Sequence, residues 1–240
     1  MTNPTAAMLV IGDEILSGRT RDANMHYLAG QLTERGITLC EVRIVSDHRD
    51  AIIAAVRALS QAYDHVFTSG GIGPTHDDIT ADCIAAAFDD HIDVRADARA
   101  LLAEFYAQTG RELNEARLRM ARIPDRATLI DNPVSVAPGF TLENVHVMAG
   151  VPSVFQAMVA SVLPTLTGGK PLISDTVRLM RGEGDVAQPL SEIAAKFPSV
   201  QIGSYPFQQD GRFGTNIVLR TTDADVLDQA TALVAALKGD

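Results

Sequence analysis

The chain contains 240 residues, of which 46% are apolar and 21% are charged, a composition ordinary for a globular protein with a sizeable core. Its formal net charge of −10 argues against nucleic acid as a partner, because binding a phosphate backbone requires clustered lysine and arginine. The two cysteines show no metal-ligand spacing, and so few cysteines fit a protein of a reducing compartment. The apolar run at 6–11 is too short for a signal peptide or a membrane span. We expect a soluble cytoplasmic protein that binds neither nucleic acid nor membrane.

Strand and helix patterns alternate through the first part of the chain. The continuous apolar run at 6–11 is typical of a strand buried on both faces of a parallel sheet. Apolar residues at helical spacing predict helices over 24–35 and 50–62, and two further β-rich runs predict strands at 37–45 and 66–68. This alternation predicts an α/β protein with a parallel sheet and right-handed crossovers.

The rest of the chain divides at a glycine- and proline-containing break. Before the break, the patterns predict helices at 81–88, 96–109, 114–120 and 153–166, the last with Ser153 as N-cap, and strands at 127–130, 137–141 and 145–148. Residues 167–171 set the predicted boundary between a domain at 1–168 and a small α/β domain at 172–240. The small domain is predicted as β-α-β-β-α: a strand at 176–180, a loop at 181–185, a helix at 189–197, paired strands at 200–207 and 216–221, and a helix at 225–237.

Residues 64–80 carry the clearest functional pattern. A short strand leads into Gly70, Gly71 and Gly73, and a polar cluster containing Asp77 and Asp78 is predicted to open a helix near residue 75. Open α/β sheets bind ligands at such corners, where glycines let a ligand approach backbone N–H groups and a helix N-terminus suits a phosphate. Two carboxylates beside a phosphate require a cation, so the pattern indicates metal-assisted phosphate chemistry.

A structural explanation of the same residues stands beside the functional one. Thr75 and Asp78 fit a capping box, in which Thr75 is the N-cap and Asp78 reaches back to it. On that interpretation the acids only finish a helix and the glycines only form a turn. The loop is neither a Walker A sequence nor a dinucleotide fingerprint.

Acidic residues also follow the other predicted strands. Asp13 comes after the first strand, Asp47 after the second, and Asp77 and Asp78 after the third. The carboxyl ends of parallel strands lie along one edge of a sheet, so these four acids are expected to converge there. Aspartate is also a common turn residue, which could account for two of them.

Other polar groups give weaker signals. The histidines lack metal-pair spacing, and no G-x-S-x-G nucleophile motif occurs. Arg111, Arg117, Arg119 and Arg122 could flank an anionic ligand, although a solvated helix face is the more ordinary explanation for them.

The run 70–80 (Gly-Gly-Ile-Gly-Pro-Thr-His-Asp-Asp-Ile-Thr) resembles the signature of the MoaB/Mog (molybdopterin-binding) domain superfamily. Stretches 12–16, 21–24, 132–139 and 150–152 make the chain most similar to the CinA (competence/damage-inducible protein A) branch. The resemblance runs in order over residues 6 to about 166, and residues after 171 resemble the small α/β domain that follows in that family.

The resemblance implies a three-layer α/β sandwich that binds a phosphorylated pterin or nucleotide and commonly forms a homo-oligomer, a dimer or trimer. Molybdenum-cofactor members adenylylate molybdopterin with ATP and Mg²⁺, whereas CinA-type members are associated with metal-dependent hydrolysis of nucleotide pyrophosphates such as ADP-ribose. Matched position by position, it implies catalytic roles for Asp78 and Asp47. The implied substrate-binding positions are Gly12, Asp13, Gly70, Gly71, Gly73, Pro74, Thr75, Thr80, Gly139 and Gly150.

The sequence is therefore compatible with three functions. The first is a nucleotide pyrophosphatase in which Asp77 and Asp78, with Asp47 or Asp13, bind Mg²⁺, Mn²⁺ or Co²⁺ and the glycine amides hold a phosphate. The second is molybdopterin binding or adenylylation at the same corner. The third is nucleotide sensing without catalysis.

The sequence departs from the family pattern at several positions. Ser135 stands where the family usually has glycine, Ala149 replaces a proline, and residues 183–185 read Glu-Gly-Asp where Gly-Glu-Ser is typical. The first two departures favour the sensing alternative. No region resembling the nicotinamide mononucleotide deamidase domain of many CinA proteins follows, so deamidation is not expected.

Overall fold

The computed structural model describes residues 3–209 and 211–238. The chain forms two compact units divided between Gly169 and Lys170, and each is described by itself. Within the described residues, no helix combines the length and the apolar character needed to cross a membrane.

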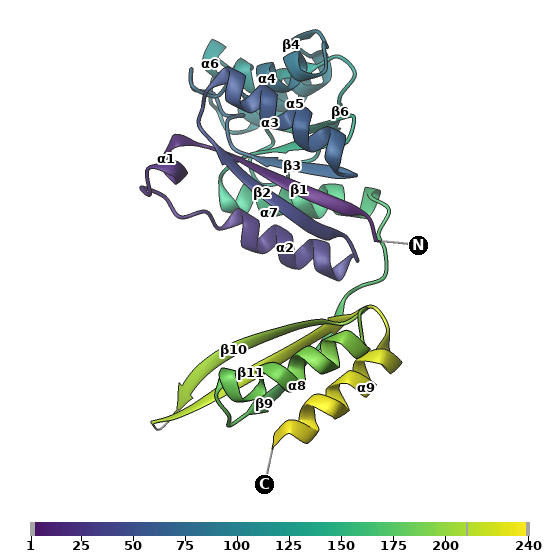
Figure 1. Ribbon diagram of the computed structural model, residues 1–240. Helices are drawn as coiled ribbons and strands as arrows, with labels where there is room; N and C mark the ends of the chain where they lie inside the picture. The colour runs from purple at the N-terminus through teal and green to yellow at the C-terminus, as the bar shows by residue number, and fades with distance from the viewer. Residues whose placement is uncertain (1–2, 210, 239–240) are drawn as a thin grey trace. The chain divides into compact units, whose positions relative to one another are not determined.

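The first unit is built on a six-stranded sheet with the order β2-β1-β3-β8-β7-β6 (Figure 1). Its strands are β1 (Thr5–Ile11), β2 (Thr38–Val45), β3 (His65–Ser69), β6 (Thr128–Ile130), β7 (Gly139–Leu142) and β8 (Val145–Met148). Strands β2, β1, β3 and β8 are parallel, and β7 is antiparallel to both of its neighbours. The predicted α/β class with a mostly parallel sheet is confirmed.

Two apolar cores cover the two faces of this sheet. Helices α3 (Arg49–Ala62), α4 (Thr80–Ala87) and α5 (Ala96–Gln108) contribute to one core, and α2 (Asn24–Glu34) and α7 (Pro152–Val162) contribute to the other. Strand β1 supplies both, with Ala7, Leu9 and Ile11 in the first core and Met8 and Val10 in the second. The apolar run at 6–11 is therefore continuous because both of its faces are buried. The unit has the three layers that the family resemblance implies.

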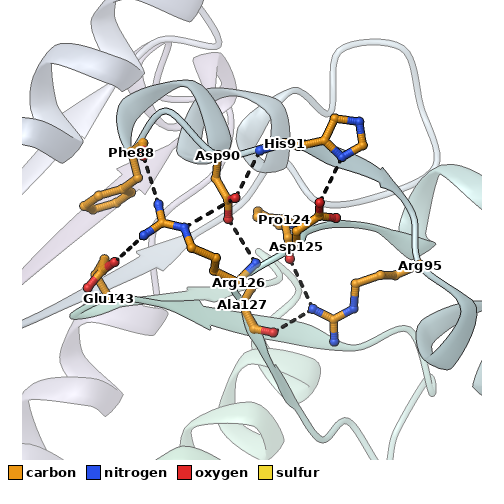
Figure 2. Close-up of polar contacts among 9 residues, drawn as sticks. All are labelled: Phe88, Asp90, His91, Arg95, Pro124, Asp125, Arg126, Ala127 and Glu143. Atoms are coloured by element: carbon orange, nitrogen blue, oxygen red, sulfur yellow. Dashed lines mark hydrogen bonds and ion pairs between the residues drawn. The ribbon is translucent and has the colours of Figure 1, made fainter.

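A small antiparallel ribbon, which the sequence patterns did not predict, adjoins the sheet. It pairs β4 (Ile92–Val94) with β5 (Arg122–Pro124). Figure 2 shows two arginines that tie the ribbon to its surroundings. Arg126 donates to the Phe88 carbonyl and to the Glu143 carboxylate, and its backbone N–H donates to Asp90. Arg95 donates to the carbonyls that flank the turn after β5.

Short elements complete this unit. They are α1 (Asp13–Leu16), α6 (Glu115–Leu118) and the 3₁₀ turns η1 (Arg119–Ala121) and η2 (Leu163–Thr165). The helix predicted over 114–120 is thus a single α-turn followed by a 3₁₀ turn. Ser153 was predicted as the N-cap of the helix at 153–166, which is wrong: α7 has Val151 as its N-cap and Pro152 in its first turn. Proline suits that position because its missing N–H would be unpaired there anyway.

The second unit is a three-stranded antiparallel sheet with two helices on one face (Figure 1). Its elements are β9 (Ile173–Leu179), α8 (Glu183–Lys196), β10 (Gln201–Gln209), β11 (Arg212–Thr221), α9 (Ala224–Ala235) and the 3₁₀ turn η3 (Ala236–Lys238). The predicted β-α-β-β-α order holds. However, α8 begins at Glu183 rather than at residue 189, so part of the loop predicted at 181–185 is helix. The apolar stripe of Val186, Leu190 and Ile193 buries this longer helix against the sheet.

Candidate functional site

A pocket of about 510 Å³ opens at the carboxyl edge of the six-stranded sheet. Its wall is formed by residues within the segments 11–20, 70–78, 132–137 and 149–154, together with Asp47 and Met120. Strands β3 and β8 are parallel neighbours, with Ser69 paired to Met148, so the loops that follow them start side by side. The two glycine-containing corners of the sequence, at 70–73 and 149–152, therefore face one pocket. The N-terminus of α7 forms part of the wall and favours negative charge there.

The glycine loop adopts the positive φ angles that glycine permits, but one of its three predicted amide donors is already occupied. Gly70 has φ +110 and Gly71 has φ +71. A Cβ at Gly70 would lie 2.2 Å from the Ile11 carbonyl oxygen, and one at Gly71 would lie 2.1 Å from Thr80 Oγ1, so neither position has room for a side chain. The Gly70 N–H donates to the Met148 carbonyl at 3.1 Å and is not free for a ligand. In the described part of the chain, the amides of Gly71 and Gly73 have no partner.

The acidic segment after the glycines forms a turn instead of the predicted helix. Thr75 donates its backbone N–H to Asp78 Oδ2 at 2.9 Å, and its hydroxyl donates to the same oxygen. The reach from residue 78 back to residue 75 thus exists, but α4 begins only at Thr80, and the helix predicted from about residue 75 is wrong. Arg119 Nη2 donates to the Asp78 carbonyl at 3.2 Å and so helps to hold this turn.

Asp78 lies folded back against the glycine loop. A Cβ at Gly73 would lie 2.7 Å from Asp78 Oδ2, so glycine at 73 is needed for this carboxylate to occupy its place. Asp78 and Asp77 both line the pocket. The hydrogen bonds from Thr75 fix one oxygen of Asp78 and thereby its orientation toward the pocket.

Asp47, which follows the second strand, lies close to acids that follow the first and third strands. Its Oδ2 accepts the backbone N–H of Asp13 at 2.9 Å. Burial raises the pKa of Asp47 above its usual value, and the negative charges of Asp13, Glu14 and Asp77 raise it further, while the Asp13 N–H opposes them. Asp13 and Asp77, which were predicted to share the sheet edge with Asp47, are thus close enough to raise its pKa.

The electrostatic character of the pocket is strongly one-sided. Four carboxylates line it, those of Glu14, Asp47, Asp77 and Asp78, and among the described residues of its wall there is neither lysine nor arginine. A second, very small cavity of about 20 Å³ beside Gly73 is lined by two of the four arginines noted in the sequence, Arg119 and Arg122. Arg122 Nη2 is 2.5 Å from Asp82 Oδ1, so its charge is already paired.

These carboxylates do not form a self-sufficient metal site. Among residues 3–209 and 211–238, no three side chains of the Asp, Glu, His or Cys type are grouped closely enough to hold an ion. Mg²⁺ is nevertheless often bound by one or two carboxylates together with substrate phosphates and water. The residues present fit a cation that arrives with a phosphorylated ligand.

Several residues that the resemblance marked for substrate binding lie away from the pocket surface. The Thr80 hydroxyl is fully buried behind Gly71 and has no hydrogen-bond partner in the described structure. Gly139 lies in β7, where a Cβ would be 2.4 Å from the Val147 carbonyl oxygen, so the packing of β7 against β8 requires a glycine there. The predicted residues on the wall are Gly12, Asp47, Gly70, Gly71, Gly73, Asp77, Asp78 and Gly150, whereas Asp13, Pro74 and Thr75 are not part of it.

Two buried asparagines hold the pocket loops in place, and the sequence patterns predicted no role for either of them. Asn24, at the start of α2 and 3% exposed, donates Nδ2 to Ser69 Oγ and to the Gly150 carbonyl, both at 2.8 Å. It therefore joins the ends of β3 and β8. The sequence signal was the placement of an asparagine at the start of a helix, which by itself indicates only a cap.

Asn132 organises the third loop of the wall. Its Oδ1 accepts the N–H groups of Val134 and Ser135, and its Nδ2 donates to Ser135 Oγ and to the Ala137 carbonyl. Val136 within this loop has φ +66, an unfavourable conformation for a β-branched residue. Ser135, a departure from the family pattern, therefore contributes a hydroxyl that holds the loop.

Comparisons with known proteins agree with this architecture. Residues 7–168 match the family described as a probable molybdopterin binding domain, and residues 171–240 match the middle domain of FAD synthase. A probable FAD synthase of Caenorhabditis elegans is 33% identical in an alignment that covers 98% of this chain and 49% of that protein. A protein of Pyrobaculum calidifontis is 34% identical over 212 residues, covering 85% of this chain and 81% of that protein.

A solved structure shows the same relationship. The crystal structure of the protein CinA from Thermoplasma acidophilum, described as having unknown function, superposes with a TM-score of 0.63 at 31% identity. It covers 69% of this chain and 99% of that one. The chain spans about half the length of the FAD synthase relatives that it matches.

Proposed function

The chain belongs to the family of probable molybdopterin binding domains, and from this premise we propose that it hydrolyses a nucleotide pyrophosphate such as ADP-ribose with the help of a divalent cation. One observation carries the proposal. The pocket wall combines unpartnered glycine amides with four carboxylates and, within the described residues, has no basic side chain. Such a wall accepts phosphate oxygens only when a cation neutralises the carboxylates.

Each group of the wall has a role in this reaction. The Gly71 and Gly73 amides and the N-terminus of α7 would hold phosphate oxygens and stabilise the charge that develops on them. Asp77 and Asp78 would bind the cation, which when present neutralises phosphate charge and polarises the phosphoryl group. Asp47 would accept the proton of the attacking water. Water adds to one phosphorus, the bond from that phosphorus to the bridging oxygen breaks, and two monophosphates are released.

The test compares wild type with Asp78→Asn and a matched control. Release of AMP from ADP-ribose, and of AMP and FMN from FAD, is followed by chromatography with Mg²⁺, Mn²⁺ or Co²⁺ and with EDTA. Asp228→Asn makes the same chemical change at an exposed position of α9 and serves as the control. We expect Asp78→Asn to lose about 100-fold or more in turnover, since a charge that acts on the transferred phosphoryl group is removed, and the control to keep it.

The outcomes separate the alternatives. Hydrolysis by Asp78→Asn at the wild-type rate would overturn the proposed role of this corner. If wild type binds the nucleotides but turns over none of them with any of the three metals, hydrolysis is wrong and nucleotide sensing is favoured.

Adenylyl transfer is the second candidate, favoured by the match of the first unit to molybdopterin-binding domains and of the second to a domain of FAD synthase. The same amides and carboxylates would hold ATP, and a phosphate of a pterin or flavin would replace water as the attacking group. Mixing ATP, Mg²⁺ and either molybdopterin or FMN distinguishes the two. An adenylylated product with release of pyrophosphate supports transfer, and hydrolysis of ADP-ribose without such a product supports the pyrophosphatase.

A further inference from the structure

The sheet of the second unit has one covered face and one open face. Helices α8 and α9 pack on the same side (Figure 1), and alternate residues of the strands, including Val177, Leu179, Ile217 and Leu219, are buried beneath them. The residues between these positions point to the opposite side, because successive side chains of a strand alternate between faces. This second set is called the open sheet face.

The open sheet face has a charge opposite to that of the whole chain. It carries Arg178, Arg212 and Arg220, and among the described residues of β9, β10 and β11 that point to this side there is no aspartate or glutamate. The chain as a whole has a formal net charge of −10, so an all-positive face departs from its surroundings. Such a face favours an anionic ligand.

Two aromatic rings lie on this face directly above glycines. Tyr205 folds over Gly203, where an added Cβ would be 3.1 Å from Tyr205 Cε2. Phe207 lies over Gly214, where a Cβ would be 2.3 Å from Phe207 Cζ. Glycine inside a strand weakens it and often marks a close approach, and here both glycines make room for a ring to lie flat. The side chain of Tyr205 remains accessible, with 52% of the residue exposed.

The arginines are placed around these rings. Arg178 Cζ lies 4.1 Å from the centre of the Phe207 ring, and its guanidinium also donates to the Gln209 side chain. Tyr205, Asn216 and Arg178 form one row across the three strands. Gly203 pairs with Val218, and Arg220 is two residues further along β11 on the same face, a distance of about 7 Å. A planar ring stacked on Tyr205 would have cationic groups within reach of a phosphate attached to it.

We propose that the open sheet face binds an aromatic mononucleotide, with its ring stacked on Tyr205 and its phosphate held by Arg220. A single accessible ring suits a single base, and the acidity of the rest of the chain opposes a long polyanion. A second copy of the same face fits poorly, since a two-fold interface would bring its arginines toward one another. This site is distinct from the carboxylate pocket and does not depend on the proposed hydrolysis.

The experiment measures the affinity of the full chain for FMN by fluorescence anisotropy, with EDTA present and in an Asp78→Asn background. We expect Tyr205→Ala to weaken FMN binding about tenfold or more, because stacking on one ring contributes an effect of that size, and Tyr205→Trp to retain it. Phe213→Ala is the matched control, since Phe213 is on β11, 67% exposed, and belongs to the alternate set that faces the helices. It should bind FMN as wild type does.

A second pair of variants tests the phosphate contact. Arg220→Gln should weaken FMN while leaving riboflavin, which lacks the phosphate, unaffected, and Lys196→Gln on α8 should change neither. Circular dichroism verifies that each variant is folded. The proposal is overturned if Tyr205→Ala and Arg220→Gln bind FMN as tightly as wild type. It is also overturned if the chain with Tyr205 and Arg220 intact shows no FMN binding. Tighter binding of a single-stranded oligonucleotide than of FMN or AMP to this face would overturn it as well. So would a dimer that dissociates in the Tyr205→Ala variant.

Discussion

The buried histidine of β8 makes the first unit sensitive to acid. His146 is only 3% exposed, with Nδ1 3.0 Å from Thr141 Oγ1 and Nε2 3.3 Å from His65 Nδ1. Its ring centre lies 4.9 Å from that of Phe67. Burial lowers the pKa of His146 from 6.5 to about 3, and the neighbouring His65 contributes in the same direction.

The size of the effect follows from the proton balance. Between pH 6.5 and pH 3 the unfolded chain holds a proton on this imidazole and the folded chain does not, so stability falls as the pH falls. The stabilisation is complete above the unfolded pKa. At about pH 4.5, two units below it, the loss is about 2.7 kcal/mol, at about 1.36 kcal/mol for each unit.

Urea unfolding, followed by far-UV circular dichroism at about pH 7 and about pH 4.5, measures this loss. We expect the free energy of unfolding of His146→Gln to depend less on pH than that of wild type, by about 2.7 kcal/mol over this interval. His26→Gln, at an exposed position of α2, is the control and should follow wild type. Equal pH dependence in wild type and His146→Gln would falsify the reasoning, because the imidazole would then not be the group that titrates.

Two further variants test the carboxylate pocket. Asp47→Asn keeps an acceptor for the Asp13 N–H but removes a charge whose pKa is raised by burial and by neighbouring acids. The variant should therefore raise the melting temperature at neutral pH, and raise it less in acid, while turnover of ADP-ribose falls. A lower melting temperature than that of wild type at neutral pH would contradict this expectation. Gly70→Ala would place a Cβ 2.2 Å from the Ile11 carbonyl oxygen, at a backbone φ of +110. We expect this variant to lower the free energy of unfolding by about 1–3 kcal/mol and to lose most of the turnover. Gly184→Ala, with nothing within 4 Å of its Cβ, is the control, and equal unfolding energies for the two glycine variants would show that the loop relaxes freely.

The parallel core could be predicted because its signal is local. The run at 6–11 is apolar at every position, and such a run in a strand has to be covered on both faces. The structure buries Met8 and Leu9 in opposite cores, as that rule requires. The β4–β5 ribbon could not be predicted in the same way. Each of its strands has three residues, and its pairing joins segments about thirty residues apart.

Helix α8 begins earlier than the sequence predicts because a local side-chain contact offsets the effect of a proline. Pro189 has no N–H to donate to the carbonyl of Asp185, and a proline inside a helix is normally disruptive. Arg181 Nη2 donates to that same carbonyl at 3.1 Å, so the acceptor is not left unpaired. Together with the buried stripe of α8, this contact lets the helix run through the proline. The sequence contains both residues, but it does not indicate that they meet.

The candidate site could be predicted only as far as strand order allowed. Each acid could be assigned to the end of a strand, and the parallel pattern gave these ends a common edge. The neighbouring position of β3 and β8 could not be derived, because a long segment containing helices and the β4–β5 ribbon separates them in the chain. That neighbouring position brings the two glycine corners into contact, since a Cβ added to Gly150 would lie 3.3 Å from the Gly70 Cα. It also lets Asn24 bond residues from both corners.

Three exceptions to ordinary folding rules lie around the carboxylate pocket. Val136 holds a positive φ between two residues of the wall, Asp47 carries a raised pKa, and the Gly71 amide lacks a partner in the described structure. Each feature costs stability in the isolated chain, whereas away from the pocket polar groups such as Arg126 and Asn144 are well paired. Proteins keep such local conflicts mainly where function requires them. A phosphate with its cation would relieve two of the three at once, since the phosphate gives the amide an acceptor and the cation neutralises the neighbouring carboxylates.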